Sequence, residues 1–376
     1  MFKPAITGTG VFTPNQTITN AELVDAFNAY ADTFNAENAE AISAGEIEAK
    51  PHSSTGFIFS ASGIEQRYVM DKTGVLDPAV MHPHLRPRSN EEPGIMAEMA
   101  LDACGKALAQ SGRTAEEVDL VICAASNHER PYPAIAIEIQ QLLGAGGFAF
   151  DMNVACSSAT FGIQAAADMI RAGSVRRALV INPEICSGHL EWRDRDCHFI
   201  FGDVATAMII EAKENATSDD QFEILGAKCA TEFSNNIRNN SGFLNRSEGD
   251  FTSTPFDQDR LFVQNGRKVF REVVPLVSAM ITEHLGELGI EPSSLKRMWL
   301  HQANIHMNDM IGKKVLGREP TPEEQPNILK DYANTSSAGS IIAFAKHHDG
   351  IEPGDISIIC SFGAGYSAGN VVVKRL

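Results

Sequence analysis

The chain has 376 residues, 43% of them hydrophobic and 21% charged, which is typical of a folded protein with two packed units of similar size. A formal net charge of -17 disfavours a nucleic-acid partner, and no apolar run reaches the ~18 residues that indicate a membrane span. Seven widely spaced cysteines without a CxxC pair disfavour a disulfide framework and a structural zinc site, so we expect no metal. No signal peptide is recognised, so we expect a cytoplasmic protein.

The first strongly patterned element is a helix predicted from Ile95 to Gly112, with apolar residues at helical spacing. It leads into a strand-like segment, VDLVICAASN, which ends at Asn127. Residues 30–56 and 73–93 are rich in Ala, Glu, Pro and His and show no strand pattern. We interpret both ranges as insertions that cover the core.

Cys156 opens the next predicted helix, in ACSSATFGIQAAADMIRAG, and a strand, ALVIN, follows that helix. A cysteine at the start of a helix lies at the positive end of the helix dipole, beside unpaired N–H groups. Both effects favour the thiolate, so we expect a lowered pKa at Cys156 and interpret the other six cysteines as buried structural residues.

The second part of the chain repeats this order. After a polar, loop-like segment at residues 233–262, which we interpret as a third insertion, a helix is predicted from Val269 to Gly289, followed by a strand that ends in HQAN. The segment ANTSSAGSIIAFAKHHDG and the strand ISIIC then correspond to the Cys156 segment. Asn304 lies 177 residues after Asn127, and Asn334 lies 178 residues after Cys156.

The two offsets agree to within one residue, which predicts a duplicated α/β protein with halves at residues 1–212 and 213–376. Alternating helices and strands predict helices packed on mostly parallel sheets, here two sheets related by a pseudo-dyad. Open α/β sheets bind ligands at the carboxyl ends of their strands. Cys156, His301 and Asn334 all follow predicted strands, so we expect them to face one another across the pseudo-dyad.

A glycine-rich loop, SFGAGYSAG, follows the strand ISIIC and could aim backbone N–H groups at an oxyanion. No helix follows it, so it is a poor nucleotide site. The pairs His82/His84 and His301/His306 lack the partners and the spacing of a metal site, and solvated or hydrogen-bonded histidines are expected there.

Taken together, ACSSA, HQAN, ANTSSAGS and FGAGY resemble the β-ketoacyl-acyl-carrier-protein synthase III family over nearly the whole chain. The resemblance implies a thiolase fold with a five-layered αβαβα core, a homodimer, and acyl-CoA and malonyl-acyl-carrier protein as substrates, without a cofactor. It further implies that Cys156 is the acylated nucleophile and that His301 and Asn334 bind the malonyl thioester carbonyl. The backbone N–H groups of Cys156 and Ala364 would form the oxyanion hole.

The resemblance also implies roles for substrate-binding residues. Arg195 would lie over the CoA adenine, and Tyr132 would help to close the partner's acyl tunnel. Phe57 stands close to where the family has a Trp that holds CoA, and Ala61 close to where it has an Arg. The family Arg after HQAN is His306 here. Arg271, Lys313 and Lys314 would dock the acidic carrier protein; solvated surface charges are the alternative for these three.

The expected function is therefore a decarboxylative Claisen condensation of an acyl-CoA primer, longer than acetyl, with malonyl-acyl-carrier protein. A thiolase or hydroxymethylglutaryl-CoA synthase is a rival, although Cys360 lies on a strand and is interpreted as structural. Acyl transfer from Cys156 to a hydroxyl or amine without decarboxylation is a second alternative. A non-catalytic acyl-CoA-binding scaffold is a third, against which the presence of all three reactive residues counts.

Overall fold

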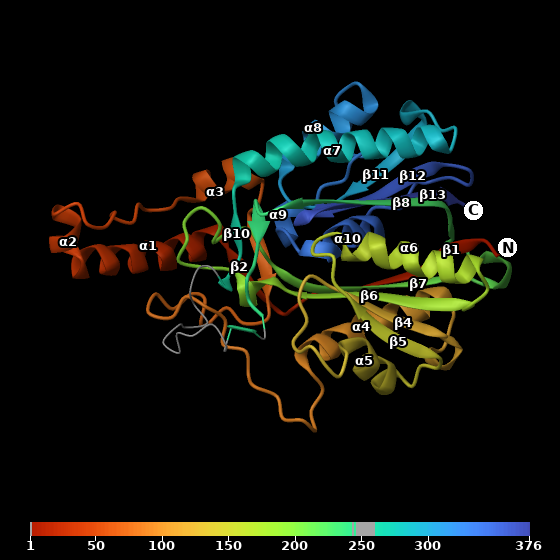
Figure 1. Ribbon diagram of the computed structural model, residues 1–376, viewed down its shortest axis with the longest axis horizontal. Coiled ribbons are helices and arrows are strands. Elements are labelled where there is room, and N and C mark those ends of the chain that lie inside the picture. The colour runs from red at the N-terminus through yellow and green to blue at the C-terminus, as the bar shows by residue number, and fades with distance from the viewer. Residues whose placement is uncertain (1, 243, 246–259) are drawn as a thin grey trace.

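The computed structural model describes residues 2–242, 244–245 and 260–376, and shows a five-layered core (Figure 1). Helices α7 and α8 form one outer layer, α4 and α5 form the other, and α6 and α10 lie between two layers of strands. The core helices are α4 (Ile95–Ser111), α5 (Ile135–Leu143), α6 (Ser158–Arg171), α7 (Gly266–Glu287), α8 (Ile305–Leu316) and α10 (Gly339–Lys346). The expected αβαβα architecture is confirmed.

Nine strands form one hydrogen-bonded array in the order β11-β12-β13-β8-β1-β7-β6-β4-β5. These strands are β1 (Pro4–Phe12), β4 (Leu120–Ala124), β5 (Phe148–Met152), β6 (Arg177–Ile185), β7 (Asp203–Ala212), β8 (Phe222–Ser234), β11 (Leu295–Leu300), β12 (Ile356–Gly363) and β13 (Gly365–Arg375). The two expected sheets are therefore joined, through a short antiparallel pairing of Ala5 and Ile6 with Glu223 and Phe222.

The expectation of mostly parallel sheets was wrong. Among the strand pairs of this array in the described residues, only β4–β5, β4–β6 and β11–β12 are parallel, and the others are antiparallel. The reason is local, because β7 and β13 return beside β6 and β12 without a crossover helix. Ala364 alone separates β12 from β13, which leaves room only for a hairpin.

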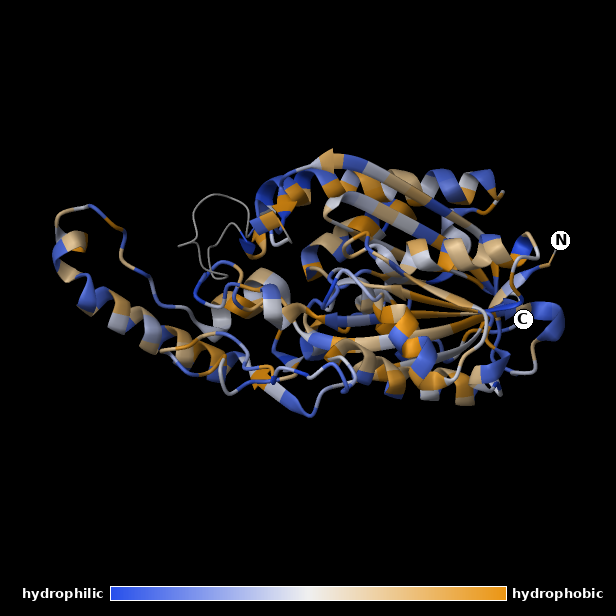
Figure 2. Ribbon diagram, turned by 60° about the horizontal axis from the view of Figure 1, so that its bottom comes forward, coloured by the Kyte–Doolittle hydropathy of each residue, from blue (hydrophilic) through white to orange (hydrophobic). Residues whose placement is uncertain are grey.

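The central helix layer is the most deeply buried part of the core. One face of α6 carries Ala159, Ile163 and Ala166, each fully buried, and Trp299 packs edge-to-face on Phe344 at 4.8 Å between ring centroids. In Figure 2 the strands that run through the body and converge toward the C-terminus are coloured largely as hydrophobic. Burial of this surface on both sides fixes the ends of α6 and α10, where the candidate site lies.

The predicted repeat elements are present. The helix expected at residues 95–112 is α4, with Gly112 in a left-handed conformation at its end, and the helix expected at residues 269–289 is α7. The helices after Cys156 and Asn334 are α6 and α10, and the strands after them are β6 and β12. The division at residues 212 and 213 falls at the end of β7 and remains our proposal for the boundary between the halves.

The insertion at residues 30–56 does not cover the core. Helix α1 (Asn20–Glu37) continues into it and, with α2 (Ala39–Ser43) and the chain that returns to α3 (Thr55–Ser62), forms an arm that projects from the body (Figures 1 and 2). A capping box between Thr19 and Glu22 starts α1, and Leu23 and Phe27 are buried at its base. The arm is anchored there beside the antiparallel pair of β2 (Gln16–Thr19) and β3 (Gln66–Val69).

The other two insertions are largely irregular, as expected. Residues 73–93 form turns and coil. In the segment 233–262, β8 extends to Ser234 and is followed by β9 (Ile237–Arg238), which pairs with β10 (Val263–Gln264). The remainder of that expectation, residues 243 and 246–259, lies outside the described residues. A short helix, α9 (Leu329–Tyr332), precedes Asn334.

None of the helices in the described part of the chain has the length and apolar character required to cross a bilayer.

Candidate active site

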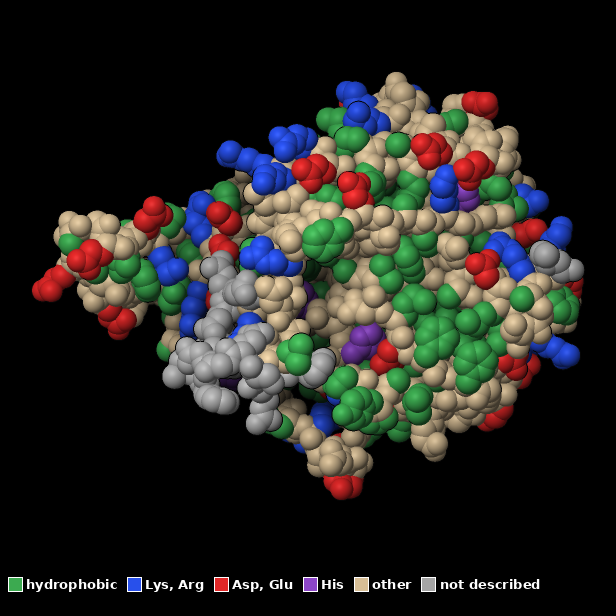
Figure 3. All heavy atoms as spheres, in the orientation of Figure 1, with side chains coloured by type: hydrophobic (Ala, Val, Ile, Leu, Met, Phe, Trp, Pro, Cys, Tyr) green, Lys and Arg blue, Asp and Glu red, His purple; other side chains and the backbone are tan. Residues whose placement is uncertain are grey.

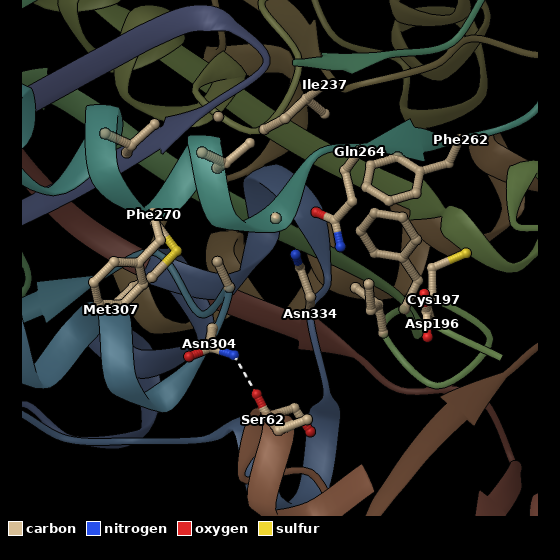
Figure 4. A pocket seen from close by; sticks show the side chains of 18 of the residues that line it. Ser62, Asp196, Cys197, Ile237, Phe262, Gln264, Phe270, Asn304, Met307 and Asn334 are labelled. Carbon is tan, nitrogen blue, oxygen red and sulfur yellow. Dashed lines mark hydrogen bonds between the residues drawn. The ribbon is translucent and has the colours of Figure 1, made fainter. Parts of the chain in front are cut away.

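A cavity of about 830 Å³ brings together residues from both halves of the chain. Cys156, His301 and Asn334 all line it, together with Gly363. Aromatic side chains form much of the remaining wall, contributed by Phe199, Phe201, Phe262, Phe270 and Phe362. Figure 4 shows the labelled wall residues around this space, with Asn334 projecting into it. The expectation that the three reactive residues face one another therefore agrees with the fold.

Cys156 lies in the turn between β5 and α6, where its sulfur is close to two other turns. Ala155 before it has a positive φ of 47°, an uncommon conformation for a residue with a Cβ. The Ser336 hydroxyl donates to the Cys156 Sγ at 3.4 Å. A Cβ placed on Gly363 would lie 2.6 Å from the Cys156 Cβ, so only glycine fits there without displacement.

The expected lowering of the Cys156 pKa was wrong for the free protein. Burial raises the pKa of this thiol to about 11; the Ser336 hydroxyl and the Ala364 N–H act in the opposite direction, and the charge of Glu184 adds to the increase. Helix α6 begins at Ser158, two residues beyond the cysteine, and its dipole does not offset the desolvation of the thiolate. Cys156 is therefore a neutral thiol before substrate binds.

His301 follows β11 directly and is held by its backbone and by its ring. Its N–H donates to the Cys360 carbonyl at 2.7 Å, and its ring lies edge-to-face on Phe362 at 5.1 Å between centroids. The residue is 2% exposed, and burial lowers the pKa of His301 to about 4, with a Ser336 backbone hydrogen bond acting in the opposite direction. The imidazole is thus neutral at physiological pH and can donate one N–H to a substrate oxygen.

Asn334 is fixed by a strained turn. Its N–H donates to the Ile200 carbonyl at 2.9 Å, and its Oδ1 accepts from the Ser336 N–H at 2.8 Å. Ala333, directly before it, and Ser336, two residues after it, have positive φ values of 56° and 50°. Because the oxygen is already used, the amide nitrogen is the group left to face the cavity, as Figure 4 shows.

The glycine-rich loop is the tip of the β12–β13 hairpin. Gly365 has a φ of 132°, which disfavours any side chain, and Gly363 approaches Cys156 closely. The Ala364 N–H is directed toward the Cys156 sulfur and favours its charged form. This places one of the two expected oxyanion-hole donors beside the nucleophile.

Of the three expected substrate-binding residues, Phe57 lines the cavity, and Arg195 does not line it but contacts Phe57. The Arg195 guanidinium stacks on the Phe57 ring at 3.9 Å while its Nε donates to the His52 carbonyl at 2.8 Å. Tyr132 is 82% exposed and does not line the cavity of its own chain. The structure therefore brings Phe57 and Arg195 to the site and leaves Tyr132 on the surface.

Basic side chains gather over the N-terminal end of α7 and on α8 (Figure 3). Arg271, Lys313 and Lys314 are exposed, as expected, although Arg271 pairs with Glu272 at 3.8 Å and Lys313 pairs with Glu319. Sequence reasoning missed Arg267, which lines the cavity, and its neighbour Lys268. Their position in the first turn of α7, after Asn265 as N-cap, would have indicated a basic rim beside the expected site.

Two residues already named in the sequence, His306 and Asn304, have contacts at the site that the sequence did not predict. His306 lines the cavity with its Nε2 3.0 Å from the Ser60 carbonyl, and Asn304 donates to the Ala61 carbonyl at 2.6 Å (Figure 4, dashed). These two bonds hold α3 against α8. Ser336 was within a quoted motif, but its contact with Cys156 depends on a backbone conformation that sequence does not specify.

One group in the described part of the chain has the side chains of a metal site, Cys123, His128 and Asp151. The Asp151 carboxylate already accepts the N–H groups of Ile135 and Ala136, each at 2.8 Å, and so caps α5. The His128 Nε2 is 4.0 Å from Asp151. The group is explained by helix capping and gives no support to a metal.

Comparisons with known proteins agree with the motifs. The family model described as 3-oxoacyl-[acyl-carrier-protein] synthase III matches residues 150–232, and the model of the C-terminal part of that family matches residues 285–375. A β-ketodecanoyl-[acyl-carrier-protein] synthase of Pseudomonas aeruginosa is 53% identical over 352 residues, which cover 94% of this chain and 100% of the relative. A β-ketoacyl-[acyl-carrier-protein] synthase III of Acidiphilium cryptum is 34% identical over 280 residues, 73% of this chain and 83% of that one.

Solved structures support the fold. The 3-oxoacyl-[acyl-carrier-protein] synthase III of Aquifex aeolicus has a TM-score of 0.75 at 24% identity and covers 99% of both chains. The priming β-ketosynthase of the R1128 polyketide pathway has a TM-score of 0.77 at 22% identity, with 99% of this chain and 96% of that chain covered. At such identities the likeness shows the architecture alone.

Proposed function

The chain belongs to the 3-oxoacyl-[acyl-carrier-protein] synthase III family of condensing transferases, and from this premise we propose that it condenses a medium-chain acyl-CoA primer with malonyl-acyl-carrier protein. The observation that carries the proposal is the meeting of Cys156, His301 and Asn334 at one cavity, which supplies a nucleophile and two hydrogen-bond donors. The thiolase and scaffold alternatives have no comparable support.

In the first step, Cys156 attacks the acyl-CoA thioester. The bond from sulfur to the acyl carbon forms, the bond to the CoA sulfur breaks, and the proton of the Cys156 thiol leaves on the CoA thiol. The N–H groups of Cys156 and Ala364 stabilise the oxyanion of the tetrahedral intermediate. The position of the Ala364 N–H beside the sulfur supports this role.

In the second step, the malonyl thioester loses CO₂ and its electron pair becomes an enolate. His301 and the Asn334 amide donate to the enolate oxygen, which carries charge only as the reaction proceeds. A neutral imidazole and a free amide nitrogen suit this task. The α-carbon then attacks the acyl carbonyl on Cys156, a carbon–carbon bond forms, the bond from the sulfur to the acyl carbon breaks, and the thiolate takes a proton from water.

We propose an eight-carbon primer. The 53% identical relative is named for a ten-carbon β-keto product, and malonyl condensation adds two carbons. Each buried CH₂ contributes about 0.8 kcal/mol, so six extra carbons would favour octanoyl over acetyl by up to ~5 kcal/mol if all are buried.

Two partners are part of the proposal. Carrier-protein docking is supported by the basic rim of Arg267, Lys268, Arg271, Lys313 and Lys314, which gives an acidic chain a local cationic surface. A homodimer is supported by an exposed apolar face over α5 and the edge strand β5 (Figure 3); its large members are Tyr132, Ile137, Leu142 and Phe148. In that dimer, Tyr132 would close the partner's acyl tunnel.

The Phe57 and Arg195 stack is proposed to part and hold the CoA adenine. A cytoplasmic location is also proposed, supported by seven cysteines that are all described and all unpaired.

The test is the mass of the protein after incubation with a series of acyl-CoAs from acetyl to decanoyl. We expect an octanoyl adduct on wild-type protein and none on Cys156→Ala. Addition of malonyl-acyl-carrier protein should then release CO₂ and discharge the adduct. Faster acylation by acetyl-CoA than by octanoyl-CoA would refute the medium-chain proposal, and discharge to a hydroxyl or amine without CO₂ would favour simple acyl transfer.

A further inference from the structure

A buried carboxylate, that of Glu184, lies between the two halves directly behind the site. Glu184 comes from β6 and is 1% exposed. From the first half, it accepts the Ser126 N–H at 3.0 Å and the Ser126 hydroxyl at 2.5 Å. From the second half, it accepts the Ser337 N–H at 3.3 Å and the Ser337 hydroxyl. One side chain thus ties together two turns that are more than two hundred residues apart.

The turn held by Ser337 is the one that carries the reactive groups of the second half. Its neighbour Ser336 contacts the Cys156 sulfur through its hydroxyl and the Asn334 oxygen through its N–H. Ser336 and Ala333 both have positive φ, a conformation that persists only where surrounding contacts impose it. The hydrogen bonds that Ser337 donates to Glu184 supply such a contact on the side facing away from the cavity.

The charge of Glu184 is not balanced by a cation, since within the described residues it forms no ion pair. The titratable groups that interact with it include three thiols: Cys186 in the 3-10 turn that follows β6, with the sulfur 3.8 Å away, Cys123 on β4 and Cys156 itself. Burial raises the pKa of Glu184 to about 7, while the bonds from Ser126 and Ser337 act against that increase. A second negative charge at Cys156 is disfavoured as long as this carboxylate is ionised.

We propose that Glu184 is a positioning residue: its carboxylate fixes the turn that carries Asn334 and Ser336, and its negative charge adds to the burial that keeps Cys156 a neutral thiol until substrate binds. The thiol would then be protected from alkylation and oxidation between turnovers. The geometric part rests on the proposed roles of Cys156 and Asn334. The electrostatic part can be measured without any substrate.

The first experiment measures alkylation of Cys156 by iodoacetamide as a function of pH, with the modified peptide followed by mass spectrometry. Glu184→Gln removes the charge and keeps the shape. We expect the apparent pKa of Cys156 to fall, with alkylation near neutral pH becoming about tenfold faster, which corresponds to one unit of pKa. Glu184→Asp, which keeps the charge, should restore the wild-type profile.

The matched control is Asp203→Asn. Asp203 is also a fully buried carboxylate held by a serine, accepting the Ser187 N–H at 2.8 Å and hydroxyl at 2.7 Å, but it does not touch the turn at Ser337. Its replacement should change the melting temperature and leave the alkylation profile of Cys156 unchanged. If Glu184→Gln likewise changes only the melting temperature, the electrostatic part of the proposal is wrong.

The second experiment separates the two half-reactions. Glu184→Gln should acylate at least as fast as wild type and lose about tenfold in malonyl decarboxylation, because a neutral amide accepts the Ser337 hydrogen bonds more weakly than a carboxylate does and the Asn334 turn loosens. If Glu184→Gln does not fold, Ser337→Ala removes one of the same hydrogen bonds and should likewise slow decarboxylation while leaving acylation unchanged. Equal losses in acylation and decarboxylation would overturn the positioning role. A wild-type protein without decarboxylation would refute the proposed function, and the alkylation profile would still report on Glu184.

Discussion

The close approach of Gly363 to Cys156 gives the sharpest prediction. In Gly363→Ala, the new methyl would lie 2.6 Å from the Cys156 Cβ, 3.0 Å from its Sγ and 3.3 Å from its N. Ordinary contacts between such atoms are about 3.5–4.0 Å, so the nucleophile or the hairpin must move by about 1 Å. A displacement of that size at a reacting group can cost about 10²-fold in rate, and overpacking costs about 1–3 kcal/mol of stability.

The assay is the rate of Cys156 acylation by acyl-CoA, read as the mass increase of the protein, together with the melting temperature. The matched control is Gly105→Ala in the interior of α4, where an added Cβ meets no atom within 4 Å. This variant should be stabilised by about 0.5–1 kcal/mol and acylate at the wild-type rate. If Gly363→Ala acylates as fast as Gly105→Ala, the tip of the β12–β13 hairpin does not position the nucleophile.

Four further predictions test the site and the fold. Cys156→Ala should form no acyl adduct while keeping the wild-type melting temperature; an adduct on this variant would place the nucleophile elsewhere. His301→Ala and Asn334→Ala should still acylate but lose about 10²–10³ in malonyl decarboxylation, and a defect confined to acylation would reverse their assignment. Burial lowers the pKa of His301 from 6.5 to about 4, so between these pH values the folded state binds fewer protons than the unfolded state. The contribution of His301 to the free energy of unfolding is therefore fully present above pH 6.5 and is lost as the pH falls toward 4. Between pH 4 and 6.5, the free energy of unfolding of His301→Gln in urea should depend less on pH than that of wild type. Glu211→Ala should lower the free energy of unfolding, measured in urea, by about 3–5 kcal/mol, because its fully buried carboxylate accepts from Arg177 at 3.0 Å. The control is Glu319→Ala, which removes the exposed pair with Lys313 and should leave the free energy of unfolding close to that of wild type.

The parts of the fold that sequence predicted are those governed by local pattern. Helices α4 and α7 carry apolar residues at helical spacing along one face, and the offsets between Cys156 and Asn334 and between Asn127 and Asn304 reveal the duplication. The reactive residues follow from the same logic, since strand ends in an α/β protein converge. Their meeting at one cavity required only that the halves pack together.

Strand direction and the electrostatics of the site were not predictable in this way. Direction depends on how the chain returns after β6 and β12, and a hairpin with a single intervening residue has little sequence signal beyond its glycines. The pKa of Cys156 depends on how completely the second half covers it, and the dipole argument considers one helix alone. Glu184 was missed because its partners, Ser126 and Ser337, are distant in sequence and adjacent only after folding.

The position of β1 has a consequence for synthesis. Residues Pro4–Phe12 are synthesised long before their partners, because they form an interior strand whose neighbours, β7 and β8, begin at Asp203 and Phe222. At about 5–20 residues per second, the nascent strand must remain unpaired for roughly 10–40 s, with both edges available to other chains. Expression of this protein should therefore depend on how well residues 4–12 are shielded during translation, and deletion of these residues would remove the strand that joins the two halves.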